Sequence, residues 1–211
     1  MKEIRYTLLT DGVSDKVLIT ILSWLLHEHC PGYAVQSAWA DLGRLPRPPK
    51  KLPERIRTSV ELYPCDLLFV HRDAEKISRE ARANEIRQAL SETEHPPAVC
   101  VVPVRMTEAW LLFDEMSIRK AAGNPNGNQP LELPIMNDIE SLPDPKQNLY
   151  NLLCLAKGHI NKRRLKSLSP NRLAFRVTES TRSFAPLREL AAFRNLEKEL
   201  LVIISALNWN A

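Results

Sequence analysis

The segment "LLTDGVSDKVL", residues 8–18, joins a strand-like stretch to a helix-like stretch through an acid and a glycine. Residues 3–10, "EIRYTLLT", predict a strand. Residues 15–29, "DKVLITILSWLLHEH", are apolar on several faces and predict a mostly buried helix. Asp11 and Gly12 stand between the two, where they form either a simple turn or one part of a metal site.

The rest of the chain continues this alternation of strands and helices. Residues 33–39, 65–71 and 97–104 are short, β-rich or apolar, and predict three more strands. Helices are predicted at residues 74–92, 107–123, 144–158 and 185–209. Strands separated by helices indicate an α/β fold with a mainly parallel sheet flanked by helices. We expect an α/β core over residues 1–122 and a helical C-terminal extension, packed on the core, over residues 123–211.

Two segments are predicted as loops. Residues 42–57 are rich in proline and basic side chains, which favours a loop over a full crossover helix. Residues 123–134 are rich in glycine, asparagine and proline, and Gly123 is placed to end the preceding helix.

The composition is that of a globular chain. It has 211 residues, of which 44% are hydrophobic, enough for a sizeable core. No apolar run approaches the roughly 20 residues that span a bilayer, and the N-terminal residues lack a signal-peptide pattern. The four cysteines form no Cys-x-x-Cys pair, which argues against a zinc cluster or disulfide framework. We therefore expect a cytoplasmic protein without membrane contact.

Basic side chains are concentrated in two segments. Residues 44–57 hold six of them against the single acid Glu54, and residues 157–188 hold nine against Glu179. Separated charge of this kind favours a polyanion such as nucleic acid as partner, although each segment can also be a solvated loop. The predicted nucleic-acid contacts are Arg44, Arg47, Lys50, Lys51, Lys162, Arg163, Arg164 and Lys166.

Acids follow three of the predicted strands. Asp11 ends the first strand, Asp73 and Glu75 follow the third, and Glu108 follows the fourth. Ligands of parallel sheets bind beyond the carboxyl ends of the strands, so these acids can converge at one edge. Carboxylates brought together repel unless a cation offsets them, and Mg²⁺ is the usual cation for oxygen ligands. Each acid also has an ordinary structural explanation, in a turn or in the first turn of a helix.

Two motifs resemble a known family. "TLLTDGVSD" (7–15) and "LLFVHRDAE" (67–75) resemble the Toprim fold of topoisomerases, primases and nucleases of the overcoming-lysogenization-defect type. That family has an acid and a glycine after strand one and an Asp-x-Asp pair after strand three. Here Asp11 stands where the family usually has Glu, and Glu75 stands where it has the second Asp.

Further segments resemble small stand-alone Toprim-like proteins encoded beside ATPase genes in bacterial defence loci. They are "VRMTEAWLLFD" (104–114) and "PLRELAAFRNLEKEL" (186–200). The resemblance implies a nuclease in which Asp73 and Glu75, helped by Asp11, hold Mg²⁺ or Mn²⁺. His71 or Glu108 would assist proton transfer.

The resemblance also implies an ATPase partner for antiviral defence. The sequence has no Gly-x-x-x-x-Gly-Lys phosphate loop, so ATP-driven control would come from a separate chain. Residues 187–207 are apolar enough either to cover the core or to form an interface, for example in a homo-oligomer.

Two other functions remain open at this stage. The first is a catalytically inactive Toprim-like subunit that binds nucleic acid or supports an ATPase complex. The second is a receiver-like signalling module, which also places acids at strand ends. A receiver needs a fifth strand and a lysine beyond its last strand, and this sequence offers no place for the fifth strand.

Overall fold

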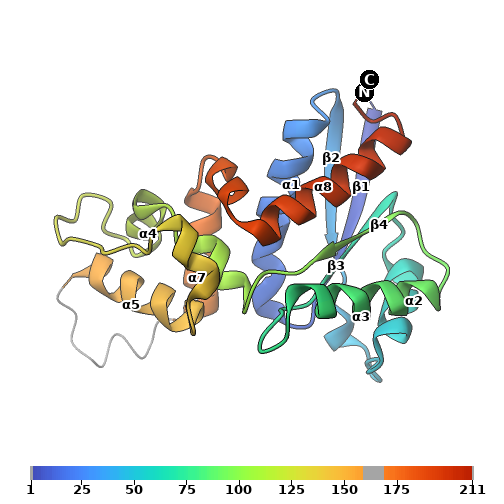
Figure 1. Cartoon of the computed structure of the whole chain (residues 1–211), viewed down its shortest axis with the longest axis horizontal. Coiled ribbons are helices and arrows are strands. Elements are labelled where there is room, and N and C mark those ends of the chain that lie inside the picture. Colours follow the sequence, from blue (N-terminus) through green and yellow to red (C-terminus); the bar gives the residue numbers. More distant parts are fainter. Residues whose placement is uncertain (1, 159–168, 211) are drawn as a thin grey trace.

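A parallel sheet forms the centre of the N-terminal half of the protein (Figure 1). The computed structural model describes residues 2–158 and 169–210. The strands in this part of the chain are β1 (Lys2–Leu9), β2 (Tyr33–Trp39), β3 (Leu67–His71) and β4 (Ala98–Val101). Their order is β2-β1-β3-β4, and each neighbouring pair is parallel. The predicted α/β class is therefore confirmed, and the architecture is consistent with a Rossmann-like fold.

Helices flank the sheet and make up most of the C-terminal half. The α-helices of the described residues are α1 (Leu18–His29), α2 (Leu52–Leu62), α3 (Arg79–Ser91), α4 (Glu115–Ala121), α5 (Pro145–Lys157), α7 (Pro170–Ser180) and α8 (Ala191–Ala206). None of the helices in this part of the chain is both long and apolar enough to cross a membrane.

The central strand β3 divides its side chains between two apolar clusters, one on each face of the sheet. Leu67 and Phe69 belong to the cluster that contains α1 and α8, and Leu68 and Val70 belong to the cluster with α2 and α3. All four side chains are fully buried. Because successive side chains of a strand point to opposite faces, an unbroken apolar run requires cover on both sides.

The helices α4, α5 and α7 form a lobe beside the sheet, and α8 returns from that lobe across the sheet (Figure 1). Their apolar side chains join the same cluster as α1, so the core is continuous between sheet and lobe. Trp110 and Phe193 meet edge to face in this core, with ring centroids 5.4 Å apart. Within residues 187–207, Leu196, Leu200 and Ile204 are buried, so this segment covers the core.

The prediction of a loop over residues 42–57 is wrong in its second half, because α2 begins at Leu52. Pro53 lies in the first turn, where no intrahelical N–H bond is needed, so proline starts this helix. Ile56 and Ser59 are the buried residues of this helix.

Two predicted helices are broken into a 3₁₀ helix and an α-helix. Residues 107–123 form the 3₁₀ helix Thr107–Leu111 and then α4, which starts where the Asp114 carboxylate accepts the N–H of Ser117. Residues 185–209 likewise contain Ala185–Glu189 and then α8. The predicted end at Gly123 is confirmed, because this glycine follows α4 with φ +77°.

Helix α3 starts at Arg79, five residues later than the pattern suggested, because Ser78 caps it. The Ser78 hydroxyl accepts the N–H of Ala81 at 3.1 Å. Replacing Ser78 by Ala is expected to lower the free energy of unfolding by about 1 kcal/mol in urea titrations. The control is Ser205→Ala at an exposed position of α8, which is expected to leave it unchanged. Equal losses in both variants would contradict the capping role.

Candidate metal centre

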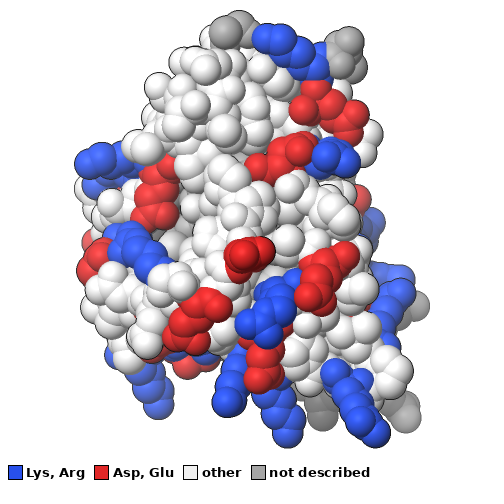
Figure 2. Space-filling view, turned by 90° about the vertical axis from the view of Figure 1, so that its right-hand side faces the viewer, with Lys and Arg blue, Asp and Glu red and all other residues white. Residues whose placement is uncertain are grey.

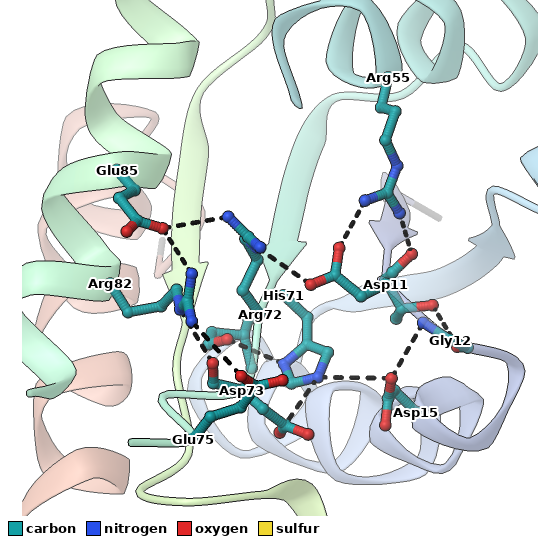
Figure 3. Close-up of polar contacts among 12 residues, drawn as sticks. Asp11, Gly12, Asp15, Arg55, His71, Arg72, Asp73, Glu75, Arg82 and Glu85 are labelled. Atoms are coloured by element: carbon teal, nitrogen blue, oxygen red, sulfur yellow. Dashed lines mark hydrogen bonds and ion pairs between the residues drawn. The ribbon is translucent and has the colours of Figure 1, made fainter. Parts of the chain in front are cut away.

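His71 ends β3 and is the buried centre of the site (Figure 3). Its Nδ1 lies 2.9 Å from the carbonyl oxygen of Val101 on β4. A carbonyl oxygen only accepts hydrogen bonds, so Nδ1 carries a proton and the lone pair of the neutral ring is on Nε2. That Nε2 lies 3.5 Å from Asp73 Oδ1 and 3.7 Å from Asp15 Oδ2. Two carboxylates therefore surround a nitrogen that can accept a proton or bind a metal ion.

Asp15 reaches this position from the 3₁₀ helix Val13–Val17, which follows β1. The Gly12 N–H donates to Asp15 Oδ2 at 3.2 Å, and the Ser14 hydroxyl donates to Asp15 Oδ1 at 3.3 Å. The side chain folds back over the turn toward the end of β3 (Figure 3). Local hydrogen bonds therefore hold this carboxylate in place beside His71.

Asp73 enters from the loop after β3. Thr107, in the 3₁₀ helix after β4, donates from its hydroxyl to Asp73 Oδ1 at 3.3 Å. The same hydroxyl lies 3.3 Å from His71 Nε2. The ends of β1, β3 and β4 thus each contribute a side chain to one small polar cluster.

The electrostatics of this cluster favour a cation. Burial lowers the pKa of His71, but the Asp15 and Asp73 carboxylates outweigh burial and raise it. Burial raises the pKa of Asp15, but the adjacent His71 outweighs it, so that pKa is lowered. For Asp73, the attraction of His71 lowers the pKa but does not outweigh burial. Burial, with repulsion from Asp15 and Glu108, raises its pKa to about 6.

The three residues fit the geometry of a metal site. Ligand atoms of Asp15, His71 and Asp73 lie within 4.8 Å of one another. Bonds of about 2.1 Å would place neighbouring ligand atoms roughly 3.0–3.4 Å apart, close to the two Nε2–oxygen distances. The Nδ1–H bond to Val101 is also the kind of contact that orients a ligating histidine. These residues could therefore hold a metal ion.

Asp11 lies beside this group in a separate network of ion pairs (Figure 3). Its carboxylate pairs with Arg55 of α2 and, at 3.0 Å, with Arg72. Burial raises the pKa of Asp11, but the two guanidinium groups outweigh it and the pKa is lowered. Arg72 and Arg82 both form ion pairs with Glu85 of α3, at 3.0 and 2.6 Å.

Of the predicted ligands Asp11, Asp73 and Glu75, only Asp73 belongs to the three-residue group.

Glu75 and Glu108 occupy different surroundings. The Glu75 side chain is 72% exposed, and its nearest ion-pair partner is Arg82 at 4.0 Å. Glu108 is buried, lies 3.4 Å from Lys146 and contributes to the raised pKa of Asp73. Glu108 therefore borders the cluster, whereas Glu75 extends into solvent.

Asp15 is the site residue that sequence reasoning missed. Its carboxylate accepts the Gly12 N–H within the turn that follows β1. Its second role depends on the fold, since His71 is 56 positions away in the chain. The sequence feature that could have indicated it is the second acid of "DGVSD" (11–15). A helical turn at this point brings the Asp15 side chain back to Gly12.

The basic residues of the first segment lie on the surface. Arg44 is exposed and pairs with Asp41 at 2.6 Å. Arg47, Lys50 and Lys51 are exposed and have no ion-pair partner within residues 2–158 and 169–210. Figure 2 shows Lys and Arg side chains projecting along the lower edge of one face, at the height of α2 in Figure 1. The predicted contacts of the second segment, Lys162, Arg163, Arg164 and Lys166, lie outside the described residues.

Comparison with known proteins gave no matching family model, no matching curated protein and no matching solved structure.

Proposed function

We propose that the protein is a metal-dependent phosphodiesterase of the Toprim type that cleaves nucleic acid. The observation that carries this proposal is the group formed by Asp15, His71 and Asp73 at the carboxyl edge of a parallel sheet. Ligands of such sheets bind at this edge. Antiviral action together with a separate ATPase is part of the same proposal and rests on the sequence resemblance alone.

The donor set favours Mn²⁺ or Zn²⁺ over Mg²⁺. Mg²⁺ is bound mainly by oxygen atoms and water, whereas one imidazole and two carboxylates suit a softer divalent ion. A divalent ion bound by these residues would stabilise the charge that develops on a scissile phosphodiester. Thr107 and Val101 would keep the His71 ring and the Asp73 carboxylate in their present orientation.

Positive side chains next to the metal group would hold the substrate. Arg55 and Arg72 converge on Asp11, so both guanidinium groups stay at the edge of the sheet. The exposed side chains of Arg47, Lys50 and Lys51 extend this positive surface. Such contacts to the phosphate backbone would give binding that weakens with salt and depends little on base sequence.

The test is cleavage of labelled plasmid, single-stranded DNA and tRNA with Mn²⁺, Zn²⁺ or Mg²⁺, with and without any co-encoded ATPase. Cleavage that requires metal is expected for the wild type and not for Asp73→Asn. The matched control is Asp138→Asn, at an exposed position outside the cluster, which is expected to cleave normally. Salt-sensitive binding without cleavage of any substrate would overturn the nuclease in favour of a catalytically inactive nucleic-acid-binding subunit.

A further inference from the structure

A cavity of about 290 Å³ opens at the carboxyl ends of β1 and β2, next to the group formed by Asp15, His71 and Asp73. Its lining comes from the turn after β1, the turn after β2, and the basic segment that leads into α2. Asp11 and Gly12 belong to this lining, and the Gly12 N–H holds Asp15. The cavity and the metal group therefore share one turn of the backbone.

The lining combines flat apolar walls with two cationic side chains and two carboxylates, Asp11 and Asp41. The carboxylates are paired with Arg55 and Arg44, respectively. Trp39, Pro48 and Pro49 supply the apolar surfaces, while Lys50 and Arg55 supply the positive charge. Planar rings and proline faces suit a nucleobase, and the two cations suit a phosphate.

The indole of Trp39 is fixed before any ligand arrives. Its Nε1–H donates to the Thr10 hydroxyl at 3.0 Å. The Lys16 ammonium lies 5.4 Å from the ring centroid. Arg55 is similarly held, since it pairs with Asp11 and donates to the Thr10 carbonyl oxygen. Binding would therefore require little ordering of these groups.

We propose that this cavity binds one unpaired nucleotide of the substrate, with the base between the apolar walls and the phosphate at Lys50 and Arg55. The connection to cleavage rests on the proposed function. A stacked base of a duplex cannot enter a pocket of this kind without leaving the helix. The protein would therefore act on single strands or single-stranded ends, of DNA or RNA.

The first experiment measures calorimetric binding of AMP and dAMP to the full chain in the presence of EDTA. Wild-type protein is expected to bind at least one of them, and Lys50→Glu is expected to weaken that binding at least tenfold. The matched control is Lys198→Glu on the exposed side of α8, which is expected to change it less than threefold. No binding of either nucleotide, or equal losses in both variants, would overturn the proposal. A preference between AMP and dAMP would separate RNA from DNA.

A second variant fills the cavity without altering charge. A Cβ atom added at Gly43 would meet only Asp41 Oδ1, at 3.7 Å, so Gly43→Phe is compatible with the backbone. Because Gly43 lines the cavity, this variant is expected to lose at least tenfold in nucleotide affinity while keeping the thermal stability of the wild type. Unchanged affinity in a folded Gly43→Phe protein would overturn the proposal.

Cleavage of matched single-stranded and duplex oligonucleotides separates this inference from the proposed function. A single-strand preference of at least tenfold, lost in Gly43→Phe, is expected. Nucleotide binding without cleavage of any substrate would uphold the subsite and overturn the nuclease. Equal cleavage of single strands and duplexes, without nucleotide binding, would overturn the subsite and uphold the nuclease.

Discussion

Mn²⁺ at about one hundred times its dissociation constant is expected to stabilise the wild-type protein against unfolding by about 2.7 kcal/mol, and Asp15→Asn by close to nothing. A ligand that binds only the folded chain raises its stability in this way, and the unfolded chain cannot hold Asp15, His71 and Asp73 within 4.8 Å of one another. Asp15→Asn keeps the shape of the side chain but removes the charge that a metal ion requires. Urea titrations with and without Mn²⁺ measure the difference.

The control for this prediction is Glu75→Gln. Glu75 was a predicted metal ligand, but its side chain is 72% exposed and outside the three-residue group. This variant is expected to keep the full Mn²⁺ stabilisation. The opposite pattern, with stabilisation lost in Glu75→Gln and kept in Asp15→Asn, would restore the ligand set inferred from the sequence.

Asp73→Asn is expected to make the metal-free protein more stable than the wild type above pH 6. Burial first, and then repulsion from Asp15 and Glu108, raises the pKa of Asp73 from 3.8 to about 6. A shift of that size means that the ionised carboxylate costs the folded state on the order of 2–3 kcal/mol. Asparagine removes this cost and keeps the side-chain volume.

The pH dependence follows from the sign of this shift. Between pH 4 and pH 6 the folded wild type binds more protons at Asp73 than the unfolded chain does, so the contribution of Asp73 to stability falls as pH rises. The advantage of Asp73→Asn is therefore expected to be absent near pH 4, to grow up to pH 6 and to stay constant above it. Thermal unfolding in EDTA measures it. The control Asp138→Asn is expected to show no such rise, and an advantage that grows toward acid would contradict the prediction.

The strands were predictable because each carries its own local signal. Residues 67–70 are apolar without a break, and such a run is stable in a strand only when both faces are covered. The role of Gly123 was predictable as well, because the residue after a helix often has a positive φ and glycine adopts that conformation most easily. The start of α2 was missed, because Pro53 and the basic side chains around it are typical of a loop, and the burial of Ile56 is known only from the structure.

The sequence predicted where the candidate site lies, but it did not predict which side chains form it. The acids after β1 and β3 do lie at one edge of the sheet, as the parallel arrangement requires. Which carboxylates face His71 depends on the backbone of each turn. The 3₁₀ helix after β1 directs Asp15 toward His71, whereas Asp11 is drawn to Arg55 and Arg72. Glu75 has a positive φ of 53° and turns away into solvent.

The amino-acid sequence determines by itself that this chain alternates strands and helices and that its acids gather where the strands end. Those properties follow from periodic burial and from the parallel direction of neighbouring strands. The tertiary structure decided that Asp15, His71 and Asp73 form the cluster and that Asp11 belongs to an arginine network. The physical reason is that charge pairing acts over a few ångströms, and only the packed turns set those distances between residues far apart in the chain.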